Sequence, residues 1–159
     1  MTRRTEFALA VGAVVVLALS AVTIAADSNV GTWKLNLAKS TYSPGPVPKS
    51  QTLKIEAWGD DGVKYTADGV DADGKPTHAE FQAKYNGKFN PFTGNPDADM
   101  IAYKRIDANT VEATTQWKGT VTGHTKIVVS TDGKTRTLTQ TGKNAKGQVI
   151  NNVLVYEKQ

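Results

Sequence analysis

The chain has 159 residues, a length that fits one domain better than two. Its formal net charge is +4, and its lysines are spread along the chain. A basic stripe with interleaved aromatic residues is missing, so a nucleic-acid partner is not expected. The chain contains no cysteine, which excludes disulfides, thiolate metal ligands and a lipid-modified N-terminal cysteine.

Residues 1–26 have the three-part layout of a secretory signal peptide. Two arginines near the start precede an uncharged apolar stretch, and small residues gather up to Ala25 and Ala26. We therefore predict a signal helix that is cleaved after Ala25 or Ala26, and a single exported domain over residues 27–159, in the bacterial periplasm or outside the cell. The alternative is an uncleaved anchor, because residues 7–26 are about as long as a bilayer span requires. No stable membrane span is expected after cleavage.

The mature part opens with a predicted strand over residues 31–36, which contains Gly31-Thr32-Trp33-Lys34-Leu35. Prolines follow at alternate positions from Pro44 to Pro48. Proline fixes φ and removes a backbone donor, so residues 40–50 cannot form a helix. This segment is predicted to be an extended loop that crosses the mouth of a barrel; a proline-rich ligand for another domain is the alternative.

Beyond residue 52, apolar and polar residues alternate with the period of half-buried strands. Asp-Gly and Asn-Gly pairs supply the turns between them. The segment 89–97 is predicted to be irregular, because it carries Pro91, Gly94 and Pro96. The predicted strands cover residues 52–57, 63–68, 80–85, 100–106, 111–117, 121–130, 135–141 and 148–157.

With the first strand, this makes about nine strands at short and regular intervals. A helical period is absent after the signal, and long crossovers between strands are missing. The pattern predicts an all-β protein, specifically an up-and-down antiparallel β-barrel of eight to ten strands rather than a Greek-key sandwich.

Both ends of the mature chain resemble the lipocalin and fatty-acid-binding (calycin) superfamily. Gly31-x-Trp33 is similar to the superfamily signature on the first strand, and Val155-Tyr156-Glu157-Lys158 is similar to the end of intracellular fatty-acid-binding proteins. The opening Gly-Thr-Trp-Lys-Leu-Asn also resembles that of small exported bacterial proteins of unassigned activity. The resemblance implies a lipocalin-like barrel with Trp33 packed across its closed end and a small molecule bound inside.

Three departures from the family limit what the resemblance says about a ligand. Fatty-acid-binding proteins hold a ligand carboxylate with an arginine two residues before the final tyrosine, and Leu154 stands there in this chain. Their helical lid is replaced by the proline-rich segment. The last strand also lacks the arginine that lipocalins place over the tryptophan. The resemblance therefore supports the barrel more than any particular ligand.

Strand parity suggests a binding site inside the barrel. If Leu138 points inward, Arg136 and Gln140 point inward with it, because side chains alternate along a strand. A buried arginine is costly unless it is paired, so Arg136 would hold an anionic group. The alternative parity turns Thr135, Thr137 and Thr139 inward and leaves Arg136 in water. The candidate ligand-binding residues are Arg136, Tyr65, Tyr85, Trp117, Phe81, Ile127 and Asn151.

The sequence contains few residue patterns that are typical of a catalytic site. The two histidines have no paired spacing for a metal site. The calcium-loop-like start at Asp71 lacks an acidic closing residue, since Gln82 stands there. A Gly-x-Ser-x-Gly elbow is missing. No metal and no cofactor are expected, and an enzyme is disfavoured without being excluded.

Three functions remain open from the sequence. The first is an exported lipocalin-like protein that binds a small, largely apolar molecule, with room for an anionic group, in its cavity. The second is a cell-envelope interaction or structural module with a filled core and no ligand, whose partner protein is unknown. The third is a hydrolase or isomerase that uses residues at the barrel mouth.

Overall fold

The computed structural model describes residues 26–159, and the predicted signal helix lies outside them. These residues form ten antiparallel strands that close into one barrel. Each strand pairs with the next along the chain, and the first strand pairs with the last. The all-β class and the up-and-down topology are therefore confirmed. The strands are β1 (Gly31–Leu35), β2 (Ser50–Ala57), β3 (Gly62–Val70), β4 (Pro76–Lys84), β5 (Asn86–Thr93), β6 (Met100–Arg105), β7 (Thr110–Trp117), β8 (Thr120–Val129), β9 (Thr135–Lys143) and β10 (Val149–Lys158).

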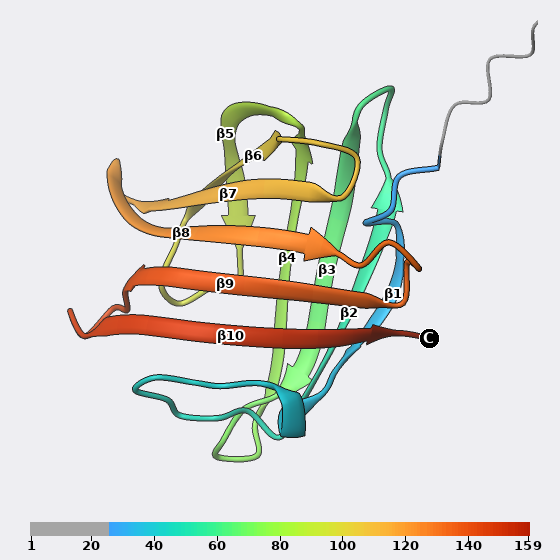
Figure 1. Ribbon diagram of the computed structural model, residues 1–159. Coiled ribbons are helices and arrows are strands. Elements are labelled where there is room, and N and C mark those ends of the chain that lie inside the picture. Colours follow the sequence, from blue (N-terminus) through green and yellow to red (C-terminus); the bar gives the residue numbers. More distant parts are fainter. Residues whose placement is uncertain (1–25) are drawn as a thin grey trace, which may run out of the picture.

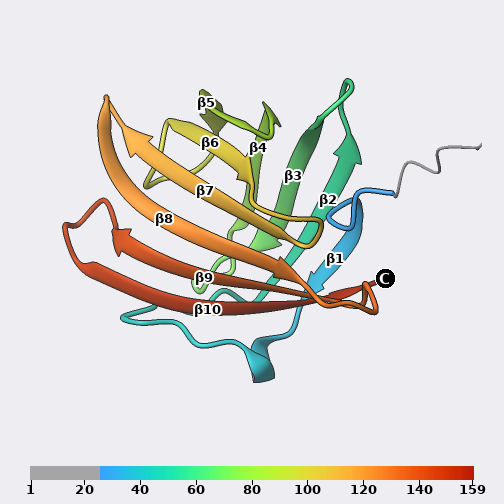
Figure 2. The same cartoon turned by 45° about the horizontal axis from the view of Figure 1, so that its top comes forward.

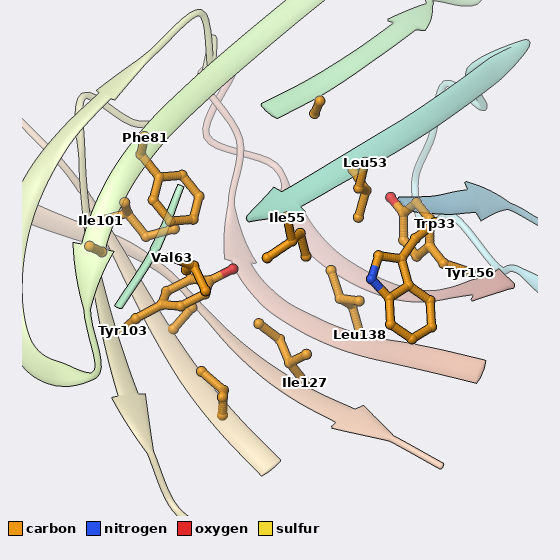
Figure 3. Packing of buried hydrophobic residues seen from close by; sticks show 14 of the residues in the cluster. Trp33, Leu53, Ile55, Val63, Phe81, Ile101, Tyr103, Ile127, Leu138 and Tyr156 are labelled. Atoms are coloured by element: carbon orange, nitrogen blue, oxygen red, sulfur yellow. The ribbon is translucent and has the colours of Figure 1, made fainter. Parts of the chain in front are cut away.

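Strands β7 to β10 form one wall of the barrel and cross strands β2 to β4 of the opposite wall at a steep angle (Figure 1). Apolar side chains from both walls fill the space between them. Figure 3 shows Trp33 and Tyr156 together at one side of this core and Phe81, Ile101 and Tyr103 at the other. Trp33 is fully buried, as the plugging role predicted for it requires.

The segment 89–97, predicted to be irregular, is largely a strand, and that prediction is wrong. Strand β5 pairs with β6 along Phe89, Asn90 and Pro91 after a register shift. The Phe92 amide donates to the Asp99 carbonyl on the β6 side. Because amides alternate in direction along a strand, the nitrogen of Pro91 faces β4 instead. Pairing with β4 is short there, so the missing donor of Pro91 costs no ladder hydrogen bond.

The seam between β4 and β5 is the weakest in the barrel wall. Only Glu80 with Thr93 and Phe81 with Phe92 are paired across it among the described residues. In each pair the two residues lie the same number of positions before and after Asn86-Gly87, where the predicted hairpin turn lies. The chain reverses there, but the strands then separate over several residues.

The proline-rich loop after β1 runs along strand β10 (Figures 1 and 2). A single 3-10 turn, η1 (Leu37–Lys39), starts it. Thr41 then pairs with Val153, and the carbonyl of Ser43 accepts from the Asn151 amide. We call residues 40–49 the strap. Beyond the end of the short strand β1, the strap continues the pairing along β10. The edge of β10 that β1 does not reach is therefore covered up to the mouth.

Candidate functional site

The parity of the last two strands decides which side chains enter the barrel. Arg136 and Leu138 on β9 are buried, while Thr139 between the inward positions is exposed. The arrangement with Arg136 inside is therefore the one adopted. On β10 the buried positions are Leu154 and Tyr156.

A cavity of about 250 Å³ lies inside the barrel. Its wall is aromatic on one side, where the rings of Tyr65 and Phe81 stack with centroids 4.6 Å apart. Phe92 meets Phe81 edge-on at 5.2 Å, and Tyr103 meets it at 5.0 Å. Aliphatic and small residues form much of the remaining lining, namely Ala67, Ala79, Ile101, Ala113, Ile127, Leu138 and Leu154, and Pro48, Gln51 and Tyr156 also contribute.

A wider hollow of about 460 Å³ continues this cavity at the barrel mouth. The two spaces share wall residues, namely Tyr42, Asn95, Thr115, Thr125 and Gln140. The outer hollow is lined by many polar side chains and by the charged residues Asp97, Lys143 and Lys146. Among the described residues, the inner cavity is lined by no charged side chain, so the charged part of the lining lies toward the opening.

Two loops and the strap narrow the mouth. Asp97 of the β5–β6 loop accepts a hydrogen bond from the Ala145 amide of the β9–β10 loop at 2.7 Å. Tyr42 of the strap lines both the cavity and the mouth. Burial raises the pKa of Tyr42 to about 12. The phenol is therefore neutral at the mouth at physiological pH.

The closed end is sealed by residues 26–30, which we call the plug. Asp27 accepts from the Tyr85 hydroxyl at 2.7 Å and from Arg105 at 3.1 Å. Ser28 donates to the Ala108 carbonyl. Burial opposes ionisation of Asp27, but hydrogen bonds from Tyr85, the Asn29 amide and Arg105 outweigh it and hold the pKa of this carboxyl below its usual range.

Two polar contacts hold Trp33 at this end. Its indole N–H donates to the Asn29 carbonyl at 2.9 Å. The Nζ of Lys158, on the last strand, lies over the ring, 5.0 Å from its centroid. The last strand has no arginine for this position, and Lys158 supplies the cation instead, which the sequence analysis missed.

Arg136 is the most unusual residue of the interior. It is 0% exposed, and its Nε lies 3.5 Å from the side-chain oxygen of Asn29. Both terminal guanidinium nitrogens are buried without a hydrogen-bond partner among the described residues. Burial raises the pKa of Tyr103 and of Tyr65, and the positive charge of Arg136 opposes both rises. A side-chain interaction of the guanidinium with the Tyr103 hydroxyl also lowers the pKa of Tyr103, so these two groups lie close together.

The predicted site residues fall into three groups. Tyr65, Phe81 and Ile127 line the cavity. Arg136 is fully buried beside Asn29 and is not among the residues that line the cavity. Tyr85 belongs to the closed end, where it binds Asp27 and lies under Arg105. Its burial raises its pKa, and the hydrogen bond to Asp27 adds to the effect.

Trp117 and Asn151 are placed elsewhere, and their predicted positions are wrong. Trp117 is 43% exposed at the end of β7, next to the turn into β8. Asn151 is exposed, because the inward face of β10 carries Asn152 at the mouth, one residue away from the predicted parity. Residues 149–155 place one asparagine among apolar residues on each face of the strand, so the pattern could not decide between the faces.

Sequence reasoning missed Tyr42, Tyr103 and the plug. Tyr103 could have been found, because it shares a face with Ile101 two residues earlier. The plug gives no periodic signal, since residues 26–30 are neither strand nor helix.

The two histidines lie on exposed positions of the barrel wall. His78 contacts Asp68 at 2.6 Å, and this hydrogen bond raises the pKa of the imidazole. Within residues 26–159, no group of three or more His, Asp or Glu side chains is placed to hold a metal ion. Over the same residues, no helix has the length and apolar character needed to cross a membrane.

Comparison with known proteins gives a fold and no family. No family model and no curated protein matches the sequence. Among solved structures, the barrel is similar to the fluorescent protein UnaG, with a TM-score of 0.54 and 14% identity over 83% of this chain and 98% of that one. A zebrafish ileal bile acid-binding protein complexed with cholic acid is less similar, with a TM-score of 0.46, 12% identity, and coverage of 83% and 99%. The likeness to UnaG confirms the barrel fold that the resemblance implied.

Proposed function

We propose that the protein is an exported binding protein that holds a small, largely apolar molecule inside its barrel. The observation that carries the proposal is the cavity of about 250 Å³ in the interior. Protein interiors are normally packed with few voids larger than a water molecule. A space of this size, walled by stacked aromatic rings and open to a polar mouth, has the layout of a small-molecule site.

Affinity in this mechanism comes from apolar burial in a preformed space. The ligand would leave water and contact Phe81, Ile127 and Leu138, and each square ångström of apolar surface buried contributes about 25 cal/mol. The strap and the Asp97–Ala145 contact would slow its release. Export is supported by the layout of residues 1–26, and the mature protein would act in the periplasm or outside the cell.

Native mass spectrometry of the mature protein tests the proposal. Protein purified without denaturation from the exported fraction of its host is expected to carry an added mass that leaves on denaturation. Bare protein that also takes up nothing from an extract of host lipids and metabolites would contradict it, and would favour the packed interaction module.

A variant that fills the cavity tests where the ligand binds, and a variant of the neighbouring outward residue is its control. Ala113 lines the cavity, and its neighbour Thr114 faces outward toward His124. Ala113→Phe should abolish the added mass, while Thr114→Phe should leave it unchanged. Equal loading of the two variants would place the ligand outside the barrel.

A further inference from the structure

The side-chain amides in the wall of the inner cavity share one hydrogen-bonding pattern. Three such amides line the cavity, namely those of Gln51, Asn95 and Gln140. The oxygen of each amide already accepts a hydrogen bond from the protein, and the donors are the Tyr156 hydroxyl, the Asp97 backbone amide and the Asn152 side chain, respectively. The nitrogen of each amide makes no hydrogen bond within residues 26–159. These amides therefore offer N–H donors to a ligand, while their acceptor oxygens are engaged.

The same wall offers a ligand no charge. Its described residues include no lysine, arginine, histidine, aspartate or glutamate. Burial raises the pKa of the four tyrosines that line it, so their phenols stay neutral at physiological pH: Tyr42, Tyr65, Tyr103 and Tyr156. Arg136 lies behind this wall with both terminal nitrogens buried, and it therefore makes no contact with a molecule in the cavity. A charged ligand group would leave water without meeting a counter-charge, which is costly.

From these two observations we infer that the ligand of the proposed function is an uncharged molecule with a carbonyl oxygen, which accepts hydrogen bonds from the cavity amides. The inference rests on that function. A carbonyl oxygen has two lone pairs and no hydrogen to donate, so it complements a group of N–H donors. A few such polar groups fix the orientation of a ligand whose affinity comes from apolar contact.

The positions of the amides indicate how the molecule would lie. Asn95 and Gln140 line both the inner cavity and the outer hollow, whereas Gln51 lines only the inner one of these two spaces. The carbonyl end would therefore lie toward the mouth, and the apolar end would pack deeper, against Phe81 and Ile127. The cavity of about 250 Å³ has the volume of about eight water molecules at roughly 30 Å³ each. A space of this size beside stacked aromatic rings suits a compact ring system better than a long chain.

Three naphthalene probes test the uncharged character of the ligand. 2-Acetylnaphthalene, 2-naphthoate and 2-ethylnaphthalene have the same rings and side groups of similar size, and they differ in the carbonyl and in the charge. In equilibrium dialysis at pH 7, the wild-type protein should bind the ketone at least about tenfold more tightly than the carboxylate, because only the carboxylate brings a charge into the cavity. Equal or tighter binding of the carboxylate, or failure of all three probes to bind, would overturn the inference.

Two variants test the amide donors. Gln140→Leu and Gln51→Leu each remove one N–H donor pair and should weaken binding of 2-acetylnaphthalene about three- to tenfold, the range for one neutral hydrogen bond. Neither variant should weaken binding of 2-ethylnaphthalene, which has no acceptor, and its retained binding also shows that the variant is folded. Gln82→Leu, at an exposed position of β4, is the control and should bind both probes like the wild type. Equal loss of affinity for the ketone and the hydrocarbon would contradict the role of the donors.

The outcomes separate this inference from the proposed function. A carboxylic acid or an amine as the added mass in the native mass spectrum overturns the uncharged ligand and leaves the binding function standing. A neutral carbonyl compound supports both. Bare protein that takes up nothing from the host extract overturns the function itself.

Discussion

Asn29 joins the two largest fully buried side chains of the barrel through two different atoms. Its backbone carbonyl accepts the indole N–H of Trp33, and its side-chain oxygen lies beside Nε of Arg136. A residue outside any strand thus fixes one side chain of β1 and one of β9. The position of the plug therefore matters for the packing of both strands at the closed end.

Replacing Trp33 by alanine should lower the free energy of unfolding by about 3–5 kcal/mol, as expected for a buried aromatic residue. The change leaves a void beside Tyr156 and the Asn29 carbonyl without its donor. Urea unfolding measures the effect. Trp117→Ala, at a half-exposed position, should cost less than about 1 kcal/mol. Similar losses in the two variants would contradict the role of Trp33 at the closed end.

Asp27→Asn should make the protein less stable at neutral pH by about 1.5–3 kcal/mol, the range for a hydrogen bond to a charged group. Because the pKa of Asp27 is lowered in the folded state, its contribution is present above the unfolded pKa of about 4 and is lost as the pH falls through the folded value. The gap between wild type and variant should therefore close in acid.

Urea unfolding at pH 7 and at pH 3 or below checks this prediction. Asp60→Asn, in the exposed β2–β3 turn, serves as the control and should have little effect at either pH. A gap that stays constant down to the lowest pH would show that the plug is held by shape and not by the ionised carboxylate.

At the scale of the strands, the sequence predicted nearly all of the barrel and missed one strand. Alternation and turn pairs located nine of the ten strands, because each has one apolar face. Strand β5 was missed since Pro91 and Gly94 normally end a strand. A proline whose nitrogen faces an open seam does not disturb pairing, and this depends on a neighbour that only the folded chain reveals.

The site was less predictable than the fold. The parity of β9 was stated correctly as one alternative, and it turns Arg136 inward. Tyr65, Phe81 and Ile127, on other strands, were placed correctly in the cavity wall. The parity of β9 could not be chosen from the sequence, because one face carries only threonines and the other mixes Leu138 with Arg136 and Gln140, so neither face is clearly apolar. Loops contribute Tyr42 and the plug, and loop positions carry no periodic signal.

The open seam between β4 and β5 should exchange its amide protons faster than any other seam of the wall. We expect rates at least about tenfold higher for β5 amides that face β4 than for amides between β9 and β10, since locally weak pairing opens without global unfolding. Hydrogen exchange followed by NMR measures this. Uniform protection around the barrel would show that other contacts hold the seam shut.

For the whole molecule, closure depends on the short contact between β1 and β10. Trp33, Lys34 and Leu35 pair with the last three residues of β10, and the Gln159 amide donates to the Thr32 carbonyl. The strap continues the contact toward the mouth. The barrel is thus completed by both ends of the described chain, so its final strand pairing joins residues that are far apart in sequence.

Deleting residues 157–159 should lower the free energy of unfolding by several kcal/mol. The deletion removes Lys158 from above Trp33, part of the β1–β10 pairing and the Gln159 hydrogen bond, each worth about 1 kcal/mol. Thermal unfolding followed by tryptophan fluorescence measures the loss. Adding a short polar extension after Gln159 should leave the Tm unchanged. A stable, fully cooperative truncated protein would show that the strap alone closes the barrel.

The first described residues and Gln159 both lie at the closed end, opposite the mouth that Asp97 and Ala145 border. A support or reporter attached through either end of this domain would therefore sit behind the barrel. Immobilised molecules would all present their openings to the solution. Molecules attached in this way would all have the same orientation on a biosensor chip, and no new attachment point would have to be engineered.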